Sequence, residues 1–379
     1  MRAHRFFVLA VLAASPLAIA CASCSSSSSG NGGTGGQDGG GKDATQSTDS
    51  GGGGPDGKAD TSTPAEGGRS EASPGDDGGG GGDGGDGGIQ TLAFDPTGTD
   101  SPVCIHWDDA AQVLYVGDDT SNQVWTWTDA NGFELYATVP DNPALDDAGD
   151  TKLNGVSELA DGTLVVVRFG FGKGGAIYTV SPDGGTATVP NVPAAEKRLQ
   201  AAPDPSTGSI YSSAFSGGGG SPAQGKIELV DLTTGTTQYA SGFGKTVGIL
   251  VQGSTIYLSD QTAGTIVMVP TSAAALADGG AGLADGGAFP VLASLSSPDM
   301  LTAGPNGTLF TDQGPQSSSD AGPPQVRQIA PDGGVTIPWP GVTFTSLNDV
   351  AYDPTHHRLF VVDSNGTTVR TIKVLPVTP

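Results

Sequence analysis

Short apolar strands recur along the chain at a nearly constant spacing from residue 89 onward. Six of them begin at Leu114, Leu164, Ile210, Ile256, Leu309 and Leu359, so successive starts lie 50, 46, 46, 53 and 50 residues apart. A segment of small and apolar residues and a Gly/Asp/Pro turn precede each strand, as in "DMLTAGPNGTLF" (299–310). Six copies of one pattern at this spacing indicate a repeated supersecondary unit.

A third segment of each unit alternates between apolar and polar residues, as in "QVWTWT" (123–128) and "TVRTIKV" (368–374). Such period-two alternation predicts strands, and residues 89–379 show no convincing helical pattern. The partial exception, "TSAAALADGGAGLADGG" (271–287), is interpreted as an inserted loop. With a weaker fourth strand in most units, the pattern predicts an all-β fold, a six-bladed β-propeller of four-stranded blades.

The ends of the repeat predict how the ring closes. The sixth unit runs out of chain before a fourth strand, while an unassigned strand, "IQTLAF" (89–94), precedes the first unit. If this N-terminal strand is the outer strand of the last blade, the ring has no open edge. This fit favours a closed propeller over a sandwich.

The first 88 residues predict export and a tether. "MRAHRFFVLAVLAASPLAIAC" has a basic start, an apolar core too short to span a bilayer comfortably and small residues before Cys21, which is typical of an export signal. "LAIAC" resembles the lipobox of bacterial lipoproteins, which implies that Cys21 is lipidated; an ordinary signal peptide cut near Ala20 or Ser23 is the alternative. Residues 22–88 are so rich in Gly, Ser and Asp that they predict a flexible tether.

The predicted organisation is therefore a signal (1–21), a tether (22–88) and a propeller (89–379). We expect an exported lipoprotein of the cell envelope, anchored in the outer membrane through Cys21. The net charge is −24, and residues 89–379 hold 29 acidic against 11 basic residues, which opposes binding to nucleic acid or to anionic lipid surfaces. We expect a monomer that takes a small molecule, a glycan or a protein at its central funnel.

Polar residues open several of the predicted inner strands, which should line the central channel. The opening positions are Pro102, Asn154, Gln200, Val247, Asp299 and Asn348, with Asp100 two residues before the first. Asp100, Asn154, Asp299 and Asn348 belong to blades that become neighbours once the ring closes. Carboxylate and amide oxygens are the ligands that Ca²⁺ prefers, so these four residues are a candidate metal site. The alternative is that they cap turns by bonding nearby backbone groups.

Three stretches resemble the gluconolactonase/regucalcin family. "DSPVCIHWDDAAQVLYVGDDTSNQVW" (100–125) resembles the first blade of that family, "SPDMLTAGPNGTLFTD" (297–312) resembles its Pro-Asp-Gly-Met stretch, and "LNGV" (153–156) resembles its Pro-Asn-Gly motif. The resemblance implies a six-bladed propeller with a divalent metal, usually Ca²⁺, in the channel, and several members hydrolyse sugar lactones. Asp100 and Asp299 would then be metal ligands, and Asp299 the proton shuttle.

The same resemblance carries departures. The family's ligand Asn in the fourth blade corresponds to Val247, so a metal site would have to be rebuilt with Asn154 and Asn348. Arg198 and Gln200 are the counterparts of the family's substrate-gripping residues. Two functions remain: a non-catalytic module that binds a ligand through its funnel, and a Ca²⁺-dependent lactone hydrolase. A His-dependent lyase of the streptogramin type would have to rely on His106, which stands alone on its strand.

Overall fold

The computed structural model describes residues 88–140, 153–218, 221–272, 274, 288–313, 323–365 and 368–379. The predicted export signal, the lipidation site at Cys21 and almost all of the predicted tether lie outside these residues. Most of the loop predicted at 271–287 lies outside them as well. No helix in the described ranges is long and apolar enough to cross a membrane.

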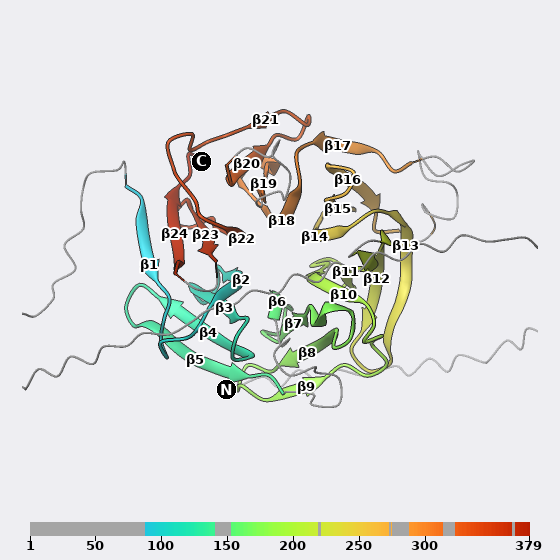
Figure 1. Cartoon of the computed structure of the whole chain (residues 1–379), viewed down its shortest axis with the longest axis horizontal. Coiled ribbons are helices and arrows are strands. Elements are labelled where there is room, and N and C mark those ends of the chain that lie inside the picture. Colours follow the sequence, from blue (N-terminus) through green and yellow to red (C-terminus); the bar gives the residue numbers. More distant parts are fainter. Residues whose placement is uncertain are drawn as a thin grey trace, which may run out of the picture. The chain divides into compact units, whose positions relative to one another are not determined.

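The described strands form six four-stranded antiparallel sheets around a central axis (Figure 1). This is a six-bladed β-propeller, as the repeat predicts. Blade one holds β2 (Pro102–Asp108), β3 (Val113–Asp118), β4 (Gln123–Thr128) and β5 (Gly132–Thr138). Blade two holds β6 (Leu153–Glu158), β7 (Leu164–Arg168), β8 (Ala176–Val180) and β9 (Thr186–Thr188).

The next two blades follow the same order. Blade three has the longest strands, β10 (Lys197–Pro203), β11 (Ile210–Gly218), β12 (Ser221–Asp231) and β13 (Gly235–Phe243). Blade four holds β14 (Thr246–Gln252), β15 (Thr255–Asp260), β16 (Thr265–Pro270) and β17 (Val291–Ser294).

Blade five holds β18 (Pro298–Ala303), β19 (Leu309–Gln313), β20 (Gln325–Ile329) and β21 (Val335–Thr336). Blade six holds β22 (Leu347–Asp353), β23 (Arg358–Ser364) and β24 (Arg370–Pro376), with β1 (Gln90–Ala93) as its outer strand. The pairing of β1 with β24, with Leu92 opposite Ile372, confirms the predicted closure (Figure 1).

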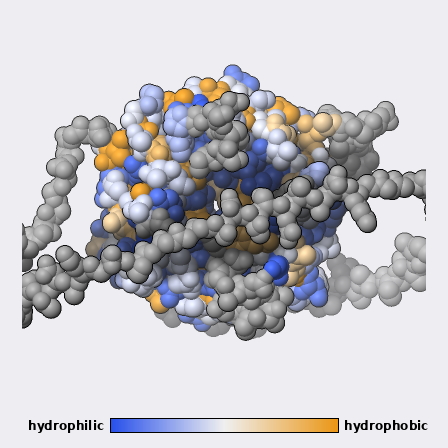
Figure 2. Space-filling view, viewed as in Figure 1, coloured by the Kyte–Doolittle hydropathy of each residue, from blue (hydrophilic) through white to orange (hydrophobic). Residues whose placement is uncertain are grey.

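The apolar core lies between neighbouring blades, because each blade buries both faces of its sheet. At the junction of blades six and one, Trp107 stacks on Phe360 with ring centroids 5.3 Å apart, and Trp125 and Trp127 belong to the same buried cluster. Over the face seen in Figure 2, hydrophilic and hydrophobic residues of the described ranges are interspersed. The large hydrophobic side chains left exposed among them are scattered over separate blades: Leu135, Phe171, Val291 and Val335.

Candidate functional site

The inner strand of every blade carries a β-bulge near its start. In all six blades the pairing between the first and second strands shifts by one residue at this point. A bulge re-aims the side chains beside it and is common next to functional sites. In each blade, one residue directly follows the last regular pair before the shift. We call these six residues the bulge ring: Val103, Asn154, Leu199, Val247, Asp299 and Asn348.

The bulge ring differs from the sequence-based alignment of the blades at two positions. Pro102 pairs regularly with Asp118, so Val103 is the member from blade one. In blade three Arg198 pairs with Ala214, so Leu199 precedes Gln200 at the equivalent position. An extra residue inside a strand has no signature in an apolar pattern, which explains both one-residue differences.

Three members of the bulge ring are polar, and they differ in the hydrogen bonds that the protein offers them. Asn154 and Asp299 are only partly exposed, and neither side chain makes a hydrogen bond to another described residue. They come from blades two and five, which face each other across the ring of six. Asn348 is partly committed, because its amide donates to the carbonyl of Ser364 at 2.6 Å. Asn154 and Asp299 are therefore the uncommitted polar groups of this ring.

Burial raises the pKa of Asp299 to about 6, and the nearby positive charge of Lys245 limits the rise. A carboxyl of this kind changes protonation close to neutral pH. Groups with such pKa values can accept or donate a proton at physiological pH, and they gather at functional sites. The interaction also places Lys245 near the same mouth of the channel.

Asp100 lies in the segment that leads into β2 and is fully buried there. The backbone N–H of Thr97 donates to its Oδ2 at 2.7 Å. Its carboxyl lies against that of Asp118, and burial followed by this contact raises the pKa of Asp100. The contacts of Asp100 are thus with its own loop and with blade one, so the structure does not group it with Asp299.

In three blades, an Asp at the last or last but one position of the second strand has a structural role. Asp118 accepts from the N–H of Ser101 at 2.8 Å and that of Thr120 at 2.9 Å, on either side of its blade. Asp260 and Asp363 accept equivalent backbone bonds from the segments that precede β14 and β22. The recurrent Asp thus ties the loop entering the inner strand to the second strand.

Two glycines next to the bulge ring allow neighbouring blades to approach each other. A Cβ at Gly155 would lie 2.3 Å from the carbonyl oxygen of Leu199 in the next blade, and a Cβ at Gly248 would lie 2.4 Å from that of Asp299. No real side chain tolerates these distances. The glycines of "LNGV" and "TVGI" are therefore required by packing between blades.

The inner strands are sheet edges, so they present unpaired backbone groups to the channel. Asp349 accepts the N–H of Ile105 from the next blade at 2.8 Å and that of Val350 at 2.8 Å. Gln200 occupies the equivalent position in blade three and accepts the N–H of Ile249 from the following blade at 2.8 Å. Gln200, predicted to bind substrate, thus ties two blades together, as Asp349 does.

Asp312 is a third acidic residue near the channel, after Asp299 and Asp349. Its Oδ1 accepts the N–H of Met300 at 2.8 Å, while its buried Oδ2 has no partner among the described residues. Burial, followed by repulsion from Asp299 and Asp349, raises the pKa of Asp312. Burial is also the largest cause that raises the pKa of Asp349. The charges of Asp299, Asp312 and Asp349 repel one another, so the protonation of each carboxyl depends on that of the other two.

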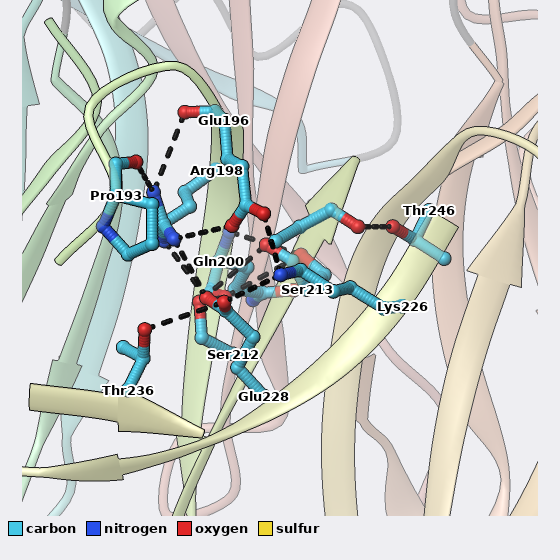
Figure 3. Close-up of polar contacts among 11 residues, drawn as sticks. Pro193, Glu196, Arg198, Gln200, Ser212, Ser213, Lys226, Glu228, Thr236 and Thr246 are labelled. Carbon is cyan, nitrogen blue, oxygen red and sulfur yellow. Dashed lines mark hydrogen bonds and ion pairs between the residues drawn. The ribbon is translucent and has the colours of Figure 1, made fainter. Parts of the chain in front are cut away.

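Arg198 is fully buried within a cluster of four charges (Figure 3). Its Nε donates to Glu228 at 2.9 Å, its Nη2 to Glu196 at 2.7 Å, and its Nη1 to the carbonyl of Pro193 at 2.7 Å. Lys226 forms ion pairs with both glutamates. Every nitrogen of the guanidinium therefore has a protein acceptor, and the predicted contact with substrate would require this cluster to open.

The other half of the bulge ring is apolar. Leu199 and Val247 pack with Phe215 and Met300 in one buried cluster. Lys197 and Lys245 hold their Nζ atoms 5.4 and 5.8 Å from the centre of the Phe215 ring. The mouth of the channel thus combines three apolar members and two nearby cations with three polar members, of which Asp299 and Asn348 come from neighbouring blades and Asn154 lies between apolar members.

The described residues do not complete a calcium site. Among them, no group of three His, Cys, Asp or Glu side chains is placed to hold a metal ion. Both oxygens of Asp349 accept backbone bonds, whereas Asp100 bonds its own loop through Oδ2 and its buried Oδ1 has no partner among the described residues. Asp299 and the amide oxygens of Asn154 and Asn348 would supply only part of the six to eight oxygens that Ca²⁺ takes from protein and water, and Val247 adds none.

These features define a six-bladed β-propeller with a partly polar channel mouth, and comparison with solved structures places the fold among known propellers. A luciferin-regenerating enzyme has a TM-score of 0.54 and 14% identity over 76% of this chain and 95% of its own. A gluconolactonase from Xanthomonas campestris has a TM-score of 0.54 and 16% identity over 77% and 90%.

Regucalcin from Agrobacterium tumefaciens, a calcium-binding protein, has a TM-score of 0.52 and 13% identity over 73% of this chain and 90% of its own. No protein-family model and no curated protein matches the sequence significantly. At these identities the likeness concerns the fold. The gluconolactonase and regucalcin structures have the architecture that the sequence resemblance implies.

Proposed function

We propose that the protein is a binding module that takes a small polar ligand at the bulge-ring mouth of its channel. The observation that carries the proposal is the state of Asn154 and Asp299. Buried polar groups in folded proteins nearly always bond to the protein or to ordered water. These two side chains have no hydrogen-bond partner among the described residues and face each other across the ring, so a ligand can supply the missing partners.

The surroundings narrow the chemistry of that ligand. Asp299 and Asn154 offer a carboxyl and an amide for hydroxyl groups. A few directed polar groups fix the orientation of the ligand in small-molecule sites. A sugar, a sugar lactone or a short sugar-bearing segment has the matching hydroxyl groups.

A second function, hydrolysis of lactone-like substrates, is supported by one observation. Asp299 has a pKa of about 6, which suits a group that moves a proton at neutral pH. The resemblance to gluconolactonases implies calcium for this reaction, whereas the donor set described above is incomplete for that ion. The binding function therefore stands first.

The test is ligand-observed NMR of the full-length protein with a panel of sugars and D-glucono-1,5-lactone. We expect at least one compound of the panel to bind, and its binding signal to disappear with Asp299→Asn and with Asn154→Ala. The signal should persist with Glu134→Gln, a change to an exposed carboxylate on the outer strand β5. Binding that ignores both bulge-ring variants would contradict the proposal.

The same samples distinguish the two functions. Turnover of the lactone that needs added Ca²⁺, stops with EDTA and is lost in Asp299→Asn would make the protein a hydrolase. Binding without turnover, with or without Ca²⁺, is the result that the binding function predicts.

A further inference from the structure

A cavity of about 660 Å³ occupies the opposite end of the channel from the bulge ring. It is lined by the second halves of all six inner strands and by the turns that follow β6 and β10. The bulge ring lies at the starts of these strands, so the two regions are separate. We call this space the strand-end cavity.

The wall of the strand-end cavity is mainly apolar. The residue two positions after each bulge-ring member is apolar and lines the cavity, which gives a ring of six: Ile105, Val156, Ala201, Ile249, Leu301 and Val350. Ligand sites in proteins enclose about 300–1,000 Å³ and have largely apolar walls, so both the size and the wall suit a small organic molecule.

The Asp and Glu side chains that line the strand-end cavity outnumber its basic residues, of which His106 is the one among the described lining residues. Its lining includes Glu158, Asp161 and Asp204, and no Lys or Arg of the described chain lines it. Hydrogen bonds from Thr163 lower the pKa of Asp161, and bonds from Ser206 and Thr207 lower that of Asp204. Both carboxyls are ionised at neutral pH, so the rim is negative.

Glu158 is the acid best placed to meet a ligand. Its carboxylate is mostly buried and lies within ion-pair distance of His106, which also lines the cavity, with Oε2 and Nε2 3.6 Å apart. At that distance the two side chains are not hydrogen bonded. A donor of the ligand that reaches Glu158 would therefore displace no bond of the protein.

We infer that the strand-end cavity binds an organic cation, an amine with an apolar body. The ammonium group lies at the rim beside Glu158 and Asp161, and the body packs against the apolar ring. A negative rim around a low-dielectric wall attracts a cation and repels an anion of the same shape. This site is independent of the proposed function of the bulge ring.

Three probes of one shape test the inference: 2-phenylethylamine, 2-phenylethanol and 3-phenylpropanoate, added to the full-length protein and followed by ligand-observed NMR titration. The amine should bind best, the alcohol more weakly and the acid least. Glu158→Gln should weaken the amine about threefold, as for a partly exposed ion pair, and leave the alcohol unchanged. Thr302→Trp, which fills the cavity, should remove both.

Two controls make the outcome decisive. Asp299→Asn at the bulge ring should leave binding of the amine unchanged, and Ala303→Phe replaces Thr302→Trp if thermal unfolding shows that the latter fails to fold. The inference is overturned if no probe binds, if the acid binds as well as the amine, or if neither cavity variant affects the amine. Loss of the amine in Asp299→Asn would also overturn it, because the ligand would then lie at the bulge ring.

Discussion

A chain that begins at Asp95, and so lacks β1 and Phe94, is expected to lose the cooperative thermal unfolding of the propeller. Without β1, strand β24 becomes an open edge, because all four residues of β1 pair with it. Phe94 is fully buried and meets Phe133 and Trp125 edge-on, with centroids 4.9 and 6.3 Å away. The truncation therefore removes both the closing strand and an aromatic contact between blades one and six.

Phe94→Ala measures the packing part of this effect alone. Removing a buried phenylalanine costs about 3–5 kcal/mol, which in a domain of this size lowers the midpoint of thermal unfolding by roughly 10 °C. A chain that begins at Gly88 is the matched control and should unfold like the full-length protein. If the chain beginning at Asp95 unfolds at the same temperature as that control, β1 does not close the ring.

Arg198→Met is expected to destabilise the protein by about 3–5 kcal/mol, the usual penalty for breaking a buried ion pair on one side only. Glu228 is almost fully buried and would lose the partner that bonds its Oε2 at 2.9 Å. The double variant Arg198→Met/Glu228→Leu should recover part of the loss, because Glu196 and Lys226 still neutralise each other.

Chemical denaturation of the three proteins gives these free energies, and the ligand titrations on the same samples decide the role of Arg198. The resemblance to gluconolactonases implies that Arg198 grips substrate. In that case Arg198→Met would abolish ligand binding and leave stability nearly unchanged. A large loss of stability, with partial recovery in the double variant, identifies Arg198 as a structural residue.

The architecture could be predicted from the sequence because six similar units repeat along the chain. Six apolar strands at a constant spacing, alternation in the third strands and an unassigned strand at residue 89 give the blades and their closure without any tertiary information. Each signal is local, and six copies reinforce one another.

The chemistry of the channel could be predicted only in part, because it depends on single residues. Asp312 in "LFTD" stands one residue earlier in its strand than the Asp of "LFVVD" and "IYLSD". It therefore bonds Met300 beside the bulge, while the other two accept backbone bonds from the loops that enter their blades. Gln200 and Asp349 share one task, accepting the N–H of the next blade, that no spacing reveals. The hydrogen-bond acceptors of Arg198 lie in two other segments, so its burial could not be predicted from the sequence either.

The central claim is that the channel mouth holds an uncommitted, half-buried carboxyl at Asp299. A raised pKa means that Asp299 favours folding at low pH. This stability is complete below pH 3.8, the value of an unperturbed Asp, and is lost as the pH rises to about 6. Asp299→Asn should therefore flatten the pH dependence of stability over this range.

The most direct measurement is a pH titration of the Asp299 carboxyl carbon by ¹³C NMR of the full-length protein. The signal is assigned by its disappearance in Asp299→Asn. The structure predicts a midpoint near 6. A midpoint below about 4.5, within the ordinary range for Asp, would show that the carboxyl is solvated or already paired, and would contradict the account of the bulge ring as a ligand site.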